Sequence, residues 1–305
     1  GNTTADNNTA VGYNSLVANT TGTRNTAVGA LALDANTTGN YNSSVGSYSL
    51  TANTTGGYNT ALGDYALGAN TTGDSNVAVG NQTLDANTTG GSNTAVGSGS
   101  LGANTTASNN TAVGKNALTA NTTGTANVAV GASALDANTS ADQNTAVGYN
   151  SLTATTTGGA NTAIGSEAMA ANTTGASNTA VGYLALDANT TASYNVAVGR
   201  EALSATTTGD GRNTAVGYYA GTLITTGNRN TVVGSVAGQA LTTGTHNSFV
   251  GNNAGGGTTT ASYNSAFGSG ALDTNSTGAN NTAIGARSLQ ANTTASNNTA
   301  VGYDS

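Results

Sequence analysis

The chain has no cysteine, proline or tryptophan, and only 6% of its 305 residues are charged. Without cysteine it can form no disulfide, thiolate nucleophile or sulfur ligand to a metal. The 13 acidic and 6 basic side chains give a formal net charge of −7 and form no basic patch, so we expect no nucleic-acid partner. No apolar run approaches the roughly 20 residues of a transmembrane helix, and no signal-peptide pattern opens the sequence. We expect no membrane insertion of this segment.

Side chains that perform acid–base or metal chemistry are also scarce. His246 is the only histidine, Lys115 is the only lysine, and Glu167 and Glu201 are the only glutamates. One chain therefore cannot assemble a catalytic triad or a histidine-rich metal site, and its aspartates form no recognisable catalytic pair. We expect a protein that is not an enzyme and that holds no cofactor and no metal ion.

The dominant feature of the sequence is a repeat. Its unit reads Asn-Thr-Ala-Val-Gly-x-x-Ala-Leu-x-Ala-Asn-Thr-Thr-Gly-x-x, and with positions numbered from the first Asn, Asn at position 1 and Gly at position 5 never vary. Successive units are 17 residues apart, except for one interval of 18 that contains an insertion at Asp210 and Gly211. The units begin at Asn8, Asn25, Asn42, Asn59, Asn76, Asn93, Asn110, Asn127, Asn144, Asn161, Asn178, Asn195, Asn213, Asn230, Asn247, Asn264, Asn281 and Asn298.

This repeat favours a parallel β-solenoid in which each unit forms one coil. Thr, Val and Asn are mediocre helix formers, and each recurring glycine would cost about 1 kcal/mol inside a helix. Thr-Ala-Val and Ala-Leu-x-Ala are predicted to be extended and to form two short sheets, because Gly bounds both segments. Stacking at about 4.8 Å would join Asn side chains of neighbouring coils into hydrogen-bonded ladders. The sequence therefore predicts one all-β solenoid domain of about 17–18 coils over residues 1–305, with a longer coil near Asp210.

The repeat also predicts which residues form the core. Position 4 is Val, Leu, Ile or Phe in every unit, and position 9 is Leu or Met in most units, as in Val28 and Leu33. We expect these two rows to face each other inside the coil. The first extended segment has Thr or Val on one face and mostly Ala on the other, so neither face is clearly polar. One face should therefore line the coil while the other packs against a neighbouring chain, which favours a homo-oligomer.

The string Asn-Thr-Ala-Val-Gly-x-x-Ala-Leu-x-Ala resembles the head repeat of the trimeric autotransporter adhesins, and similar units occur in phage tail-fibre-like proteins. The resemblance covers essentially the whole chain. It implies a left-handed parallel β-roll that assembles as a homotrimer. The Asn-Thr-Thr segment, for example Asn36, Thr37 and Thr38, lengthens each unit relative to that family.

Three rows of equivalent side chains have both a functional and a structural interpretation. Asp34, Asp85, Asp136 and Asp187 recur every three coils, about 14 Å apart, which is too far to share a calcium ion with ligands at about 2.3–2.6 Å. Asn-Thr-Thr is a glycosylation sequon, but glycans on adjacent coils would collide, which favours a structural ladder. Tyrosines fall at the predicted corners, where they cover the backbone or bind glycans and other surfaces.

The repeat is least regular from Asp210 to about Thr260. Leucine at position 9 is replaced there by Gly221, Gly238 and Gly255, and new apolar residues appear two or three places later. A bulge or a change in the cross-section of the coil would explain this section without a ligand. The alternative is a local binding feature. Its candidate residues are Arg212, Tyr218, Tyr219, Arg229, His246 and Phe249.

These patterns predict a non-enzymatic structural and adhesive fibre segment of an extracellular appendage, on the surface of a cell or a virion. Its expected partners are further copies of itself, with surface glycans or a host cell surface as additional ones. Two other functions stay open. Regular Thr and Asn ladders on a rigid face suit an ice- or surface-binding solenoid, and coils that continue to both ends of the sequence suit a self-stacking filament subunit.

Overall fold

The structure is a computed structural model that describes residues 4–305. Each repeat contributes one three-residue strand at positions 2–4, and the described residues contain no helix, hence none that could cross a membrane. The chain divides into two compact units, Gly1–Tyr149 and Asn150–Ser305. The first contains β1 (Thr9–Val11), β2 (Thr26–Val28), β3 (Ser43–Val45), β4 (Thr60–Leu62), β5 (Val77–Val79), β6 (Thr94–Val96), β7 (Thr111–Val113), β8 (Val128–Val130) and β9 (Thr145–Val147). The second contains β10 (Thr162–Ile164), β11 (Thr179–Val181), β12 (Val196–Val198), β13 (Thr214–Val216), β14 (Thr231–Val233), β15 (Ser248–Val250), β16 (Ser265–Phe267), β17 (Thr282–Ile284) and β18 (Thr299–Val301).

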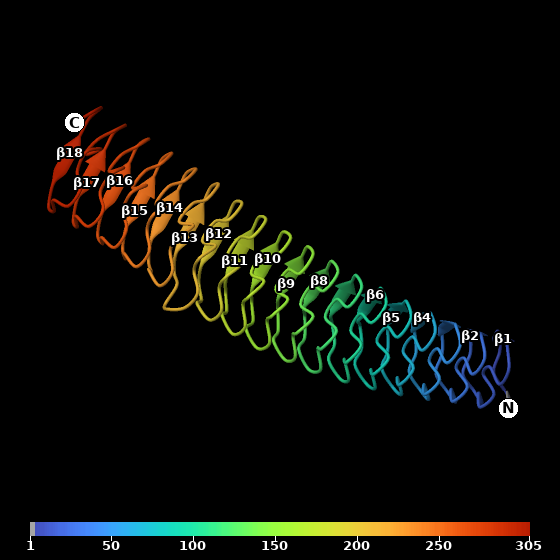
Figure 1. Ribbon diagram of the computed structural model, residues 1–305. Coiled ribbons are helices and arrows are strands. Elements are labelled where there is room, and N and C mark those ends of the chain that lie inside the picture. Colours follow the sequence, from blue (N-terminus) through green and yellow to red (C-terminus); the bar gives the residue numbers. More distant parts are fainter. Residues whose placement is uncertain (1–3) are drawn as a thin grey trace. The chain divides into compact units, whose positions relative to one another are not determined.

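Neighbouring strands within each unit are parallel and pair equivalent residues of consecutive repeats (Figure 1). Thr9 of β1 pairs with Thr26 of β2, which is the 17-residue period. Val196 of β12 pairs with Thr214 of β13, so the one 18-residue repeat leaves the strand register intact. The predictions of an all-β parallel solenoid, of its period and of one longer coil near Asp210 are confirmed.

The second segment predicted to be extended, Ala-Leu-x-Ala, is not a strand. Positions 6–11 form successive turns, closed in the second coil by hydrogen bonds from Ala32 N to Gly29 O at 3.4 Å and from Asn36 N to Leu33 O at 3.2 Å. Positions 7 and 9 have positive φ, with 57° at Leu31 and 52° at Leu33. The prediction of a second sheet is wrong because the short coil must reverse direction at these residues. At position 9 the left-handed conformation costs about 1–2 kcal/mol, which burial of the leucine side chain offsets.

The interior of the coil combines strand alanines with leucines from the turns. The middle residue of each strand points inward, so Ala27 is fully buried, as is Leu33 at position 9. The prediction that position 4 faces position 9 is wrong, because Val28 is only partly buried and the equivalent Leu62 is 48% exposed. Successive strand residues point to opposite faces, so a strand that turns its middle alanine inward must turn positions 2 and 4 outward.

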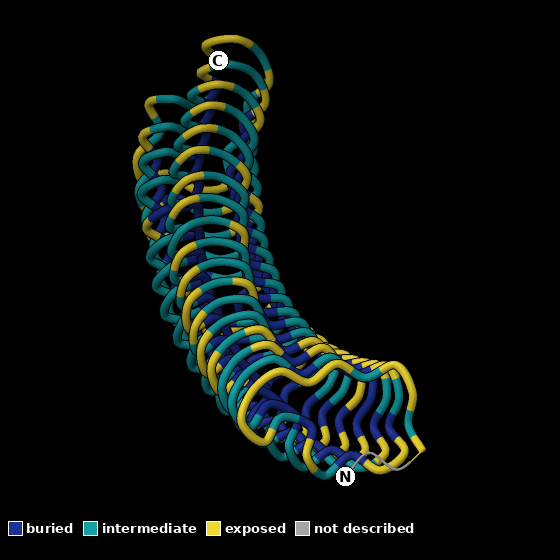
Figure 2. The backbone as a smooth tube through the Cα atoms, turned by 90° about the vertical axis from the view of Figure 1, so that its right-hand side faces the viewer, coloured by how far each residue is buried: buried dark blue, intermediate teal, exposed yellow. Residues whose placement is uncertain are grey.

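A buried row of asparagine runs along each unit at position 1, and a second row at position 12 runs along the first unit and is interrupted in the second by Thr, Ile and Leu. The backbone N–H of Asn25 donates to Asn8 Oδ1 of the preceding coil at 2.8 Å, and Asn25 Nδ2 donates to Gly39 O at 2.8 Å. At position 12, Asn36 Nδ2 donates to Asn19 Oδ1 at 2.9 Å. The predicted ladders are therefore confirmed. Figure 2 shows buried segments, in dark blue, recurring at the same place in coil after coil.

The asparagines of the Asn-Thr-Thr glycosylation sequons are these position 12 side chains. Asn36 and Asn53 are fully buried, and the Nδ2 atom of each donates to the asparagine one coil earlier and to a carbonyl of its own coil. A glycan on Nδ2 would remove these hydrogen bonds and would need space inside the coil. The folded coils therefore use the sequon asparagines as structural residues.

The invariant glycine at position 5 is required by its backbone and by the next coil. Gly63 has a φ of +143°, and a Cβ atom there would overlap the carbonyl of Gly80. A Cβ atom on Gly73, at position 15, would also lie too close to the carbonyl of Gly90 in the next coil, but its φ is not positive, and Ala107 and Ala141 occupy the same position in other coils.

We predict that Gly63→Ala lowers the free energy of unfolding by at least about 2 kcal/mol, because it adds backbone strain and a steric overlap. Gly73→Ala, at position 15 of the same coil, is the matched control and should cost less. Urea unfolding followed by circular dichroism measures both losses. Equal losses would contradict this account of position 5.

Candidate functional site

Three of the residues singled out in the irregular section share position 17, the corner before each strand. Arg212 Cζ lies 5.6 Å from the ring centroid of Tyr194, and the His246 ring stacks on Tyr263 with centroids 4.9 Å apart. Arg229 Nη2 lies 3.5 Å from a carboxylate oxygen of the inserted aspartate. Each of these side chains contacts a different neighbour along the corner, and such pairs contribute little to stability at the surface. They form a surface row rather than an enclosed site.

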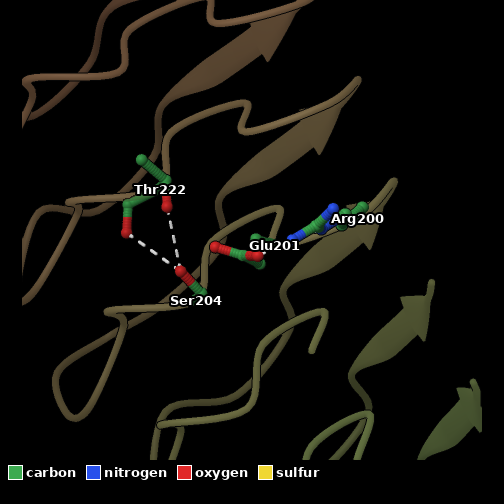
Figure 3. A network of polar contacts seen from close by, with 4 residues as sticks. All are labelled: Arg200, Glu201, Ser204 and Thr222. Atoms are coloured by element: carbon green, nitrogen blue, oxygen red, sulfur yellow. Dashed lines mark hydrogen bonds and ion pairs between the residues drawn. The ribbon is translucent and has the colours of Figure 1, made fainter. Parts of the chain in front are cut away.

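The two tyrosines lie at the opposite end of β13, at positions 6 and 7. The rings of Tyr218 and Tyr219 meet edge-on with centroids 4.4 Å apart, and Arg200 Cζ lies 6.0 Å and 5.9 Å from their centroids. Arg200 Nε also pairs with Glu201 Oε1 at 3.1 Å (Figure 3). This corner therefore combines a cation–π cluster with a carboxylate.

Phe249 is fully buried as the middle residue of β15, so it faces the core and not the surface. Most coils have alanine at this position and leucine at position 9, whereas this coil has Phe249 and Gly255. A Cβ atom on Gly255 would lie 2.5 Å from the phenylalanine ring. In the coil of β13, Gly221 at position 9 is likewise accompanied by the fully buried Ile224 at position 12. The irregular section is thus a change in the cross-section of the core, in which large and small residues exchange positions.

A cavity of about 420 Å³ lies beside the tyrosine corner, within the second unit. Its walls carry the carboxylates of Asp187 and Glu201 together with Tyr219. Ser204 and Thr222 also line it, and their hydroxyl oxygens lie 2.9 Å apart (Figure 3). The cavity therefore offers negative charge and hydroxyl groups in one place.

Burial raises the pKa of Asp187 above its ordinary value, and the nearby Glu201 and Glu167 raise it further, while two backbone N–H groups act in the opposite direction. Within residues 4–305, Asp187 Oδ1 is buried and has no hydrogen-bond partner. Glu201 accepts a hydrogen bond from Tyr219, which raises the pKa of that tyrosine. Burial and the neighbouring glutamates thus disfavour the charged form of Asp187, and the two backbone N–H groups only partly offset this.

Sequence reasoning selected Tyr219 and placed Asp187 in a row of aspartates, but it did not bring Asp187 and Glu201 together beside that tyrosine. The signal lay in the repeat positions, because stacking brings position 10 of one coil near position 7 of the neighbouring coils. Asp187 occupies position 10 of its coil, and Glu201 occupies position 7 of the following coil. Reading the sequence as a two-dimensional grid of 17 columns would have brought these residues together.

No three His, Cys, Asp or Glu side chains in the described part of the chain gather closely enough to hold a metal ion. No protein-family model matches the chain, and the comparison with curated proteins found no match.

The exchange of core residues around Phe249 predicts a specific double-mutant result. Phe249→Ala should lower the free energy of unfolding by about 3–5 kcal/mol, because it removes a fully buried ring. Gly255→Leu should also destabilise the protein, because its side chain would enter the space of that ring. The double variant restores the alanine and leucine of the regular coils. Its loss in free energy of unfolding should therefore be smaller than the sum of the losses of the two single variants. Urea unfolding of the wild type, the two single variants and the double variant gives the coupling energy between positions 249 and 255. Additive losses would contradict the exchange of large and small residues.

Proposed function

We propose that this β-solenoid is a non-enzymatic structural and adhesive segment of an extracellular appendage, carried on a cell or virion surface. Three copies of the chain assemble side by side in this proposal, each using the outward face of its strands. The observation that carries it is the apolar character of that face.

The outward strand face forms an apolar stripe in each unit. In the first unit Leu62 is 48% exposed, and in the second unit Ile164 and Phe267 are 41% and 43% exposed. All three occupy position 4, where every other coil also has a large apolar residue. Position 2 adds the methyl groups of Thr or Val on the same face in most coils. Extended apolar patches are uncommon on soluble monomers and usually mark protein contacts. A second and a third copy of the chain present the same stripe, so each can cover another.

The ladders inside each unit supply the stiffness that a structural segment needs. Backbone hydrogen bonds and the asparagine row at position 1 tie each coil to its neighbours, and repeat proteins of this kind gain stability from each added interface. The corner tyrosines supply the adhesive part of the proposal. Tyr58 and Tyr194 are more than half exposed at position 17, and Tyr218 is half exposed at position 6. Exposed tyrosines combine an apolar ring with a polar hydroxyl and therefore suit contacts with glycans or other surfaces.

A second candidate function uses the same face. Strand pairing places Thr94 beside Thr111 and Val96 beside Val113. Hydroxyl and methyl groups therefore repeat about every 4.8 Å, as an ice-binding surface requires. The two functions exclude each other on this face, because a stripe buried in a trimer is closed to ice. Thermal hysteresis of the purified protein tests the second candidate directly.

Lysine substitutions on the stripe test the assembly. We predict that light scattering at micromolar concentration gives the wild-type protein three times the 29.2 kDa mass of one chain. The variant Leu62→Lys/Ile164→Lys/Phe267→Lys should have the mass of a single chain, because burying three charges in the interface is unfavourable.

The matched control is Thr72→Lys/Thr174→Lys/Thr277→Lys. It adds the same charge to the same coils at position 14, where these threonines are exposed, and it should keep the mass of the trimer. A wild-type mass of one chain would overturn the assembly, and so would equal masses for both triple variants.

A further inference from the structure

A row of stacked side chains at position 17 of the first unit ends in an uncovered tyrosine ring. Arg24 lies over Tyr41, with Cζ 5.2 Å from the ring centroid, and Tyr41 stacks on Tyr58 with centroids 4.8 Å apart. The next residue of the row is Ser75, whose side chain is too short to cover the second face of Tyr58. Tyr41, covered on both faces, is 40% exposed, whereas Tyr58 is 62% exposed. One flat ring face is therefore open to solvent.

The second unit shows which group covers such a face. Tyr194 also occupies position 17. Arg212 follows it in the next coil, at the place that Ser75 holds after Tyr58. Arg212 Cζ lies 5.6 Å from the ring centroid of Tyr194, and its Nη1 lies 4.0 Å from a carboxylate oxygen of Asp210. At this corner the chain thus holds a guanidinium group between a tyrosine ring and a carboxylate.

A carboxylate also lies beside the open ring of the first unit. Tyr58, Ser75 and Asp74 line one surface hollow of about 440 Å³. Asp74 Oδ1 accepts a hydrogen bond from the backbone N–H of Gly57 at 2.6 Å, which fixes the carboxylate next to the residue that precedes the tyrosine. Asp74 is exposed, and among residues 4–305 it forms no ion pair. An ionised carboxylate accepts several hydrogen bonds, so Asp74 retains capacity for a charged donor.

The row at position 16 leaves this carboxylate uncovered, because Gly57 and Gly91 precede and follow Asp74 in neighbouring coils. Two other tyrosines of position 17, Tyr194 and Tyr263, are also more than half exposed. Their open faces point toward coils in which position 16 is alanine. The combination of an open ring and a free carboxylate therefore distinguishes the corner at Tyr58, and it favours a planar cation over a neutral sugar ring.

We propose that Tyr58 and Asp74 bind the guanidinium group of an arginine side chain on a partner protein. The group stacks on the ring and pairs with the carboxylate, in the arrangement that Arg212 has within the chain. A guanidinium is planar and donates parallel N–H groups to a carboxylate, whereas an ammonium group has no flat face. This site deepens the adhesive part of the proposed function, on which it rests, and it does not use the apolar stripe.

Titration of the full-length protein with Nα-acetyl-arginine methylamide tests the site. Backbone NMR signals of Gly57 and Ser75 should shift and saturate, whereas the signal of Ala126, at position 17 of a coil without tyrosine, should not. The citrulline analogue has a similar shape without the charge and should give no saturating shift. The lysine analogue should bind at least about threefold more weakly. Equal binding of the citrulline analogue, or tighter binding of methyl β-glucopyranoside, would overturn the proposal.

Matched variants assign the binding to the ring and the carboxylate. Asp74→Asn and Tyr58→Ser should each weaken binding at least about fivefold, because each removes one of the two contacts. Asp74→Asn keeps the hydrogen bond to the backbone, as Asn40 shows at the same position by accepting from Thr23 N at 2.7 Å.

The control variant is Asp142→Asn, which removes the same charge from position 16. Asp142 Oδ1 accepts from Thr125 N at 2.6 Å, but the residue that follows Thr125 is Ala126 and not a tyrosine. This variant should bind as the wild type does. Wild-type affinity in Asp74→Asn, or an equal loss in Asp142→Asn, would contradict the site.

Ser75→Arg tests the site from within the chain. It gives Tyr58 the neighbour that Tyr194 has, so the new side chain should occupy the site and abolish binding of the titrant. Unchanged binding would refute the proposal. Light scattering of the same samples separates this result from the assembly, since lost binding with a trimer mass refutes the site alone, and retained binding with the mass of one chain refutes the trimer alone.

Discussion

The asparagine at position 1 makes the hydrogen bonds on which the rest of each coil depends. Its Oδ1 accepts the backbone N–H of the next coil, as Asn8 does from Asn25, and its Nδ2 reaches a carbonyl near the end of its own coil, as Asn25 does at Gly39. One side chain thus sets both the spacing between coils and the closure of the coil. A strand of three residues has few backbone hydrogen bonds of its own, so this side chain is needed in every repeat.

Closure of a 17-residue coil explains the unusual backbone of the turns. Leucine occupies a left-handed conformation at position 9 because its side chain must enter the interior, while glycine at position 5 leaves room for the next coil. Where the core changes, volume is conserved, as in the pairing of Phe249 with Gly255. The strand register continues through that section, with Phe249 paired to Val232 and Ala266. The cavity beside Asp187 is different, because it arises where surface residues at positions 7, 10 and 11 depart from the common pattern.

The sequence alone predicts the solenoid, its period, the longer coil and the asparagine ladders, because each of these follows from the spacing of invariant residues. It does not predict which face of Thr-Ala-Val points inward. Because side chains of a strand alternate between its two faces, either the middle alanine or the residues on both sides of it can point inward. The narrow interior decides between them, since it accommodates Ala27 and Leu33 but leaves Val28 outside. The sequence also does not predict the turns at positions 6–11. Leucine rarely takes positive φ, so the segment Ala-Leu-x-Ala resembles a strand in the sequence. Asp187 and Glu201 are 14 residues apart in the sequence, and their proximity follows only from the stacking of the coils.

The central claim is that asparagine side chains close and space the coils, and NMR detection of couplings across hydrogen bonds tests it most directly. The account predicts a correlation between the backbone nitrogen of each position 1 asparagine and the side-chain Cγ of the asparagine 17 residues earlier, as for Asn42 and Asn25. Across the longer coil the correlation should join Asn213 to Asn195, 18 residues apart. Correlations at other spacings, or side-chain amides that exchange with solvent as fast as exposed ones, would contradict it.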